Sequence, residues 1–217
     1  MYTKLYEQLI LRYGDSLGFV ANGQCMCEEL RKLAGYQSHS VVAFNEAIVV
    51  GEVVAPIFSA SFNAVRARTH NVSRSFYESY TVNPLIEFLN CSFEVLVLIF
   101  DTDLFCQMNV LTLLSYLEQI QEQRQIILVT LGDEYSIEEI THSHYLHIFE
   151  SVMIAKTYDV RYAKYFELQQ DENEIASFIK AHLHLSEVEL LIRLFDNFES
   201  YGLGDSQYLK MIQNIKA

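Results

Sequence analysis

The sequence predicts an α/β fold: an open, mostly parallel, doubly wound sheet of four to five strands, Rossmann-like or flavodoxin-like, with a C-terminal helical extension. Three observations support this prediction. Up to about residue 135, short β-branched or aromatic runs alternate with amphipathic helical stretches. Beyond that point the apolar spacing is mainly helical. The composition, 51% apolar with 8 Gly and 2 Pro in 217 residues, is typical of a folded chain with a sizeable core.

Four runs of five to seven residues predict the strands. They span residues 16–21, 40–44, 94–100 and 125–131, and the third is almost continuously apolar, as buried parallel strands are. A further run at 152–157 is a candidate fifth strand. If the strand order is 2-1-3-4, right-handed crossovers place the reversal of strand order, where such sheets bind ligands, between the first and third strands.

The predicted helices lie between and after these strands. Apolar spacing indicates helices at 25–33, 59–68, 83–90 and 110–123, with a polar loop over the sheet edge at 68–80. It also indicates helices at 137–147, 158–168, 172–182, 186–201 and 206–215. Ser186 and Glu189 form a capping-box pattern, and Gly202 suits a C-cap. We therefore expect an α/β domain at 1–135 and a helical region at 136–217, either packed on it as one unit or separate.

The acidic composition argues against several partners. With 15 Lys and Arg against 28 Asp and Glu, a net charge of −13, the chain lacks the basic surface that neutralises nucleic-acid phosphates. No apolar run is long enough to cross a bilayer, and the first residues lack the pattern of a signal peptide, so we expect a cytoplasmic protein with no membrane partner. The four cysteines are too few and too irregularly spaced for a disulfide scaffold, and we expect them reduced.

Polar residues follow the strands at the expected point of reversal. Asn22 and Gly23 leave the first strand, where backbone N–H groups at a helix start can hold an anion. Glu46 follows the second strand and Asp103 the third. The competing interpretation is that Asn22 caps the next helix and Gly23 supplies a tight turn. The sequence contains neither the three-glycine dinucleotide pattern nor the Walker lysine, so it predicts neither a nicotinamide site nor a P-loop.

The segment VLVLIFDTDLF allows several interpretations. A strand followed by Asp101-Thr102-Asp103 resembles the way haloacid-dehalogenase-type phosphatases present their nucleophile and acid, but the later strands and the lysine of those enzymes are not predicted. The two aspartates also suit a divalent cation. The simplest role for Asp103 is the N-cap of a helix that begins near Leu104. Cys25 is a candidate nucleophile near a helix start, or a small apolar residue.

The basic residues and histidines support weaker hypotheses. The main basic concentration runs from Arg66 to Arg74, and it either meets an anionic ligand over the strand ends or balances nearby carboxylates. His142, His144 and His147 are close in sequence, but only the last two share a helix face and no cysteine pair completes a zinc site. No residue is therefore assigned as a metal ligand.

The order of FVANGQ, FNEAIVVGE, IFSASFNAVRAR and LIFDTDLFCQMNVLTLLSYLEQ resembles the bacterial domain-of-unknown-function family numbered 1835, over residues 16–131. The Asp-Leu-Phe-Cys-Gln block is its most specific part. The resemblance implies an α/β fold with a polar cluster at the strand ends, and brings no established activity. Gln24 and Ile99 depart from the Asp and Trp of many members. The matching positions are Asn22, Gly23, Glu46, Gly51, Arg66, Asp103, Phe105 and Gln107.

Two functions from different classes follow. The first is binding of a small polar, phosphorylated or nucleotide-like ligand at the carboxyl ends of the strands. Glu46 and Asp103 would orient hydroxyls or a metal, Gln107 would hydrogen-bond, and Arg66 would meet an anion. The second is a non-catalytic regulatory or adaptor protein whose amphipathic segment 186–212 docks a partner chain or a second copy in a homo-oligomer. The acidic charge disfavours a helix-turn-helix role for that segment, and the sequence specifies neither a cofactor nor a reaction.

Overall fold

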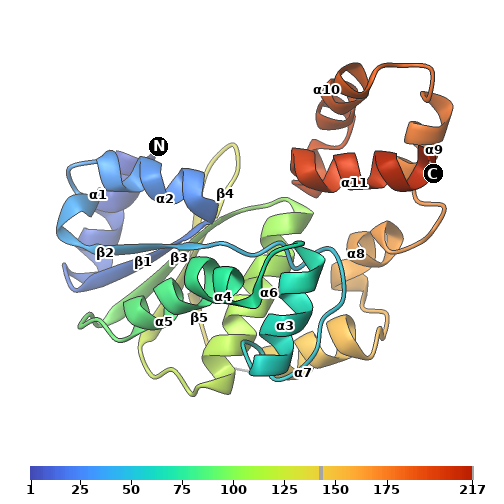
Figure 1. Cartoon of the computed structure of the whole chain (residues 1–217). Helices are drawn as coiled ribbons and strands as arrows, with labels where there is room; N and C mark the ends of the chain where they lie inside the picture. The colour runs from blue at the N-terminus through green and yellow to red at the C-terminus, as the bar shows by residue number, and fades with distance from the viewer. Residues whose placement is uncertain (142–143, 217) are drawn as a thin grey trace.

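The structure, a computed structural model, describes residues 1–141 and 144–216 (Figure 1). Its centre is a five-stranded sheet of order β2-β1-β3-β4-β5, parallel except for the β4–β5 pair. This confirms the predicted α/β fold, and the four predicted strands lie within one residue of those observed. The strands are β1 (Leu17–Asn22), β2 (Ser40–Phe44), β3 (Val95–Asp101), β4 (Gln125–Leu131) and β5 (Ser136–Ile140).

Helices cover both faces of the sheet because successive strand side chains point to opposite faces. Phe19 and Val97 face one side and pack with Leu5 and Leu9 of α1, while Val20 and Leu98 face the other side. The first face carries α1 (Tyr2–Tyr13) and α2 (Gly23–Lys32), and η1 (Tyr36–Ser38) follows α2. The second carries α3 (Ala60–Thr69), α4 (Arg74–Tyr77), η2 (Glu78–Val82), α5 (Asn83–Leu89) and α6 (Leu104–Gln119).

The segment 68–80, predicted to be a loop, is mainly helical. Ser73 accepts a hydrogen bond from the backbone N–H of Phe76 at 3.1 Å and so caps α4. Tyr77 anchors this helix in the core with 2% of its surface exposed. The prediction failed because the polar composition of the segment concealed a serine cap and a single buried aromatic residue.

The predicted helix at 137–147 is wrong in its first part, where β5 pairs antiparallel with the edge of β4. Residues 142–143, and with them His142, lie outside the described residues. The candidate strand at 152–157 is also wrong, because Val152 and Met153 are buried in the π-helical turn η3 (Glu150–Ile154), which follows α7 (Tyr145–Phe149). Short apolar runs do not distinguish a buried strand from a buried helix.

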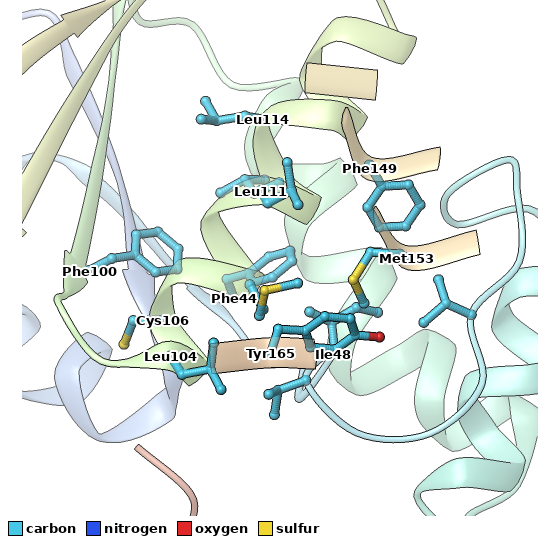
Figure 2. Packing of buried hydrophobic residues seen from close by; sticks show 14 of the residues in the cluster. Phe44, Ile48, Phe100, Leu104, Cys106, Leu111, Leu114, Phe149, Met153 and Tyr165 are labelled. Carbon is cyan, nitrogen blue, oxygen red and sulfur yellow. The ribbon is translucent and has the colours of Figure 1, made fainter. Parts of the chain in front are cut away.

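The chain after β5 continues into the same hydrophobic core. Figure 2 shows Phe149, Met153 and Tyr165 pointing into the cluster that contains Phe44 and Leu111. The remaining elements are η4 (Val160–Tyr162), α8 (Ala163–Leu168), α9 (Glu174–Ala181), α10 (Glu187–Asn197), η5 (Glu199–Tyr201) and α11 (Asp205–Lys216). Figure 1 shows α9, α10 and α11 gathered beyond α8, away from the sheet.

Two local predictions for this extension are confirmed. Ser186 and Glu189 form a complete capping box at the start of α10. Gly202 is the left-handed C-cap of η5, with φ of 63°. Within the described ranges, no helix has the length and apolar character needed to cross a membrane.

Candidate functional site

The turn after β3 places two carboxylates at the carboxyl end of the sheet. Asp101 ends the strand, and Asp103 precedes α6 with an extended backbone and accepts a hydrogen bond from the Cys106 backbone N–H at 2.7 Å. The N-cap interpretation of Asp103 is therefore confirmed. One oxygen of Asp103 caps the helix, and its carboxylate also faces a cavity.

We call this cavity of about 580 Å³ the acidic cavity. It lies at the ends of β3 and β4, and η5 and α8 of the C-terminal extension line its other side. Among the described residues, four carboxylates and one ammonium group line it, together with polar groups such as Thr102, Gln107 and Ser200. Its charged residues are Asp101, Asp103, Asp133, Glu199 and Lys164.

The C-terminal extension meets the acidic cavity through specific contacts. Lys164 donates a hydrogen bond to Ser200 Oγ at 2.6 Å and lies over the ring of Tyr201 at 4.6 Å. Gly202 approaches Asp103 so closely that a Cβ atom at this position would lie 2.2 Å from Asp103 Oδ1. Glycine is therefore required here both for its positive φ and for this contact.

The electrostatics of the acidic cavity disfavour two adjacent charges. Burial, followed by the charge of Asp103, raises the pKa of Asp101. Ligand atoms of Asp101, Asp103 and Cys106 all lie within 4.8 Å of one another. A divalent cation at this point would relieve the repulsion between the two carboxylates.

Cys106 is not suited to nucleophilic chemistry. Burial, followed by the charge of Asp103, strongly raises the pKa of its thiol. The thiol donates weakly toward Asp101 Oδ2 at 3.9 Å and accepts a hydrogen bond from the Asn22 side-chain amide at 2.8 Å. It therefore connects the acidic cavity to the interior and stays protonated at neutral pH.

Asn22 is half-buried at the end of β1 and does not cap α2 through its side chain. This corrects the capping interpretation, because its amide group is used elsewhere. Asn22 Oδ1 accepts from Asn109 Nδ2 at 3.0 Å, and Asn109 Nδ2 also donates to the backbone carbonyl of Glu46 at 2.7 Å. Gly23 does supply the expected turn, with φ of 82°. The point of strand reversal between β1 and β3 is thus occupied by protein groups.

Glu46 and Arg66 form a buried ion pair, and the expectation that Arg66 meets an external anion is wrong. Neither side chain is exposed to solvent. All five N–H groups of Arg66 have protein partners: Nε and Nη2 donate to Glu46 Oε1 at 3.2 and 2.8 Å, and the others donate to backbone carbonyls. The accepting carbonyls are those of Ala47, Val50 and Glu52.

Two further side chains complete what we call the Glu46 cluster, which comprises Glu46, Arg66, His70 and Tyr77. His70 Nε2 lies 2.8 Å from Glu46 Oε1, and the Tyr77 hydroxyl donates to Glu46 Oε2. Burial opposes ionisation of Glu46, but the charge of Arg66 and the hydrogen bonds from His70 and Arg66 outweigh it and lower the pKa of Glu46 to about 2. The cluster is an internally satisfied structural unit.

Of the remaining predicted residues, one reaches the cavity. Gln107 is exposed, lines the acidic cavity and donates through Nε2 to the backbone carbonyl of Thr102 at 2.7 Å. Phe105 is half-buried and packs against the hydrophobic core. The structure therefore brings Asp103 and Gln107 to the cavity, and it places Asn22, Glu46 and Arg66 in the polar network behind it.

Several residues of the site were not predicted. Asn109 gave a usable signal, since it is a polar residue inside the apolar run MNVLTLL, where an amide needs a buried partner. Lys164 and Glu199 gave none, because only tertiary packing brings them to the end of β3.

No protein-family model, curated protein or solved structure matches this chain. The geometry and charge of the acidic cavity are therefore the basis for assigning a function.

Proposed function

We propose that the protein binds a small phosphorylated ligand in the acidic cavity, together with a divalent cation held by Asp101 and Asp103. The observation that carries this proposal is the pair of carboxylates at the end of β3, which forms one wall of an open cavity and in which burial and the charge of Asp103 raise the pKa of Asp101. Carboxyl ends of parallel strands are the usual position of ligands in open α/β sheets.

The charge balance makes the cation part of the proposal. With four carboxylates and one ammonium group around the cavity, a bare phosphate would be repelled. Mg²⁺ is typically bound by one or two carboxylates together with substrate phosphates, which fits Asp101 and Asp103. Lys164 then supplies a positive charge on the opposite wall. We assign binding and no chemical reaction to this site.

The cellular context is also a proposal. Cys25, Cys27, Cys91 and Cys106 are free thiols. A reducing, cytoplasmic environment suits such a chain. Membership of the bacterial family numbered 1835 remains a proposal as well, supported by the polar groups at the strand ends.

The test is thermal unfolding of the protein with Mg²⁺, Mn²⁺ or Zn²⁺, with and without sugar phosphates and nucleotides. A ligand at about 100 times its dissociation constant stabilises by about 2.7 kcal/mol, which corresponds to a rise of roughly 5–10 °C at this chain length. Asp103→Asn should abolish the rise while keeping the fold, because asparagine also caps helices. Asp15→Asn, at an exposed site, is the matched control. An unchanged melting temperature with every compound, or an equal rise in Asp103→Asn, would contradict the proposal.

A second candidate function is self-association through α10. Val188, Ile192 and Phe195 are exposed at helical spacing on the side opposite the buried Leu190 and Leu194. Such an apolar row is typical of a helix that docks a second copy. Light scattering should then give a dimer that Ile192→Glu converts to a monomer of 25.1 kDa. A concentration-independent monomer in the parent protein would exclude this candidate.

A further inference from the structure

A second cavity adjoins the acidic cavity and has different chemistry. This cavity of about 390 Å³, here called the tyrosine cavity, lies between α6, β4 and the helices after β5. Its wall is apolar where Val110, Leu114 and Leu128 contribute, and Tyr145 and Tyr162 add two aromatic rings. The two cavities share Asp101, Thr102 and Gln107.

The shared wall is suited to the hydroxyls of a sugar. Thr102 and Gln107 are exposed at the junction. The Gln107 amide nitrogen is used by the Thr102 carbonyl, which leaves its oxygen as an acceptor. The Thr102 hydroxyl adds a group that can donate or accept. A ligand that spans the junction therefore meets an apolar, aromatic cavity on one side and an acidic, cation-binding cavity on the other.

Two tyrosines, Tyr145 and Tyr162, line this cavity. Both are half-buried, and burial raises the pKa of each hydroxyl, so both rings are neutral at physiological pH. Arg161, also in the wall, lies 5.9 Å from the centre of the Tyr162 ring. Planar aromatic groups stack on such side chains.

We propose that the tyrosine cavity holds a nucleobase, so that the ligand of the joined site is a nucleoside phosphate. The base stacks against the tyrosine rings, the ribose lies at Thr102 and Gln107, and the phosphate lies with its cation at Asp101 and Asp103. This inference rests on the proposed function and extends it from phosphorylated ligands in general to nucleotides. A sugar phosphate without a base would leave the aromatic half of the site empty.

The test compares AMP with ribose 5-phosphate, which has the same sugar phosphate and no base, by titration calorimetry with Mg²⁺. Base–aromatic stacking predicts that AMP binds about 5- to 100-fold more tightly. Tyr162→Ala should weaken AMP binding about 10-fold without changing ribose 5-phosphate binding, and Tyr162→Phe should restore AMP affinity. Tyr158→Ala, at an exposed tyrosine of the same segment, is the matched control.

Three outcomes separate the two proposals. If both compounds bind equally and both need Mg²⁺ and Asp103, the nucleobase site is wrong and the phosphate site stands. If AMP binds through Tyr162 without Mg²⁺ and without Asp103, the nucleobase site stands and the cation site is wrong. If neither compound binds the parent protein, both are overturned. Should Tyr162→Ala fail to fold, the affinities of the parent protein for AMP and ribose 5-phosphate still test the nucleobase site.

Discussion

The Glu46 cluster and the acidic cavity place carboxylates in opposite circumstances. Glu46 is fully buried, yet it is surrounded by donors that lower its pKa to about 2. Asp101 is only half-buried, yet burial and the charge of Asp103 raise its pKa. Exposure alone would predict a raised pKa for Glu46, because its carboxylate is the more deeply buried of the two. Internal partners, and not burial, therefore separate a carboxylate that holds the fold together from one that is available to a ligand.

A chain of hydrogen bonds joins the two regions. It runs from the Glu46 backbone carbonyl through Asn109 and Asn22 to the Cys106 thiol, which reaches Asp101. The Glu46 backbone is therefore connected by hydrogen bonds to the turn that carries the candidate ligand residues. Buried networks in which the members have partners commonly confer rigidity.

The largest expected effect follows from breaking the buried ion pair. Arg66→Met leaves Glu46 as an uncompensated buried charge, which typically destabilises by about 3–5 kcal/mol. Urea unfolding at pH 7 measures this change. Arg68→Met, two positions along α3 at an exposed site, should change the unfolding free energy by less than about 0.5 kcal/mol. If both variants unfold at the same urea concentration, Arg66 does not have the structural role assigned to it.

The Glu46 cluster should also make the unfolding free energy depend on pH in the acid range. A carboxyl group whose pKa is lowered on folding contributes stability above its unfolded pKa and loses it as the pH falls through the folded pKa. For Glu46 the window runs from 4.5 to about 2, and the contribution at stake is about 3 kcal/mol. Unfolding free energies of the parent and Glu46→Gln should therefore converge across this window. A difference that stays constant down to pH 2 would contradict the lowered pKa.

The stability contributed by Asp101 in the acidic cavity should depend on pH in the opposite direction. An acid whose pKa is raised on folding contributes stability below its unfolded pKa and loses it as the pH rises, so the Asp101 charge is unfavourable at pH 7. Asp101→Asn should stabilise the protein slightly and abolish its response to Mg²⁺, a gain in stability at the expense of function. Thermal unfolding with and without Mg²⁺ measures both. A loss of stability in this variant would show that Asp101 has a structural role.

The sheet was predictable because its signals are local. The runs at 40–44 and 125–131 match β2 and β4 in both bounds, and a buried apolar strand is recognisable without its neighbours. In contrast, Ser136–Ile140 contains two glutamates and becomes a strand because the edge of β4 is free to pair with it. Such tertiary pairing overrides local preference, and sequence periodicity does not report it.

The candidate site was predictable in part for the same reason. Asp103 and Gln107 follow β3 directly, so their place at the strand end follows from the order of the chain. Arg66 was predicted to be a ligand residue because sequence shows a charge without its partner, and Glu46 lies twenty positions away. Lys164 and Glu199 reach the cavity from the extension, which only the packing of the whole chain positions.

The smallest effect on stability should come from Gln107, and it gives the clearest separation between site and fold. Gln107→Ala removes one exposed hydrogen bond to the Thr102 carbonyl, so its unfolding free energy should change by less than about 0.5 kcal/mol. Because the side chain lies at the junction of both cavities, loss of its contact with ribose should weaken AMP binding about 3- to 10-fold. Gln8→Ala, at an exposed position on α1, should leave both quantities unchanged. Unaltered AMP affinity in Gln107→Ala would contradict the proposed contact between Gln107 and the ribose.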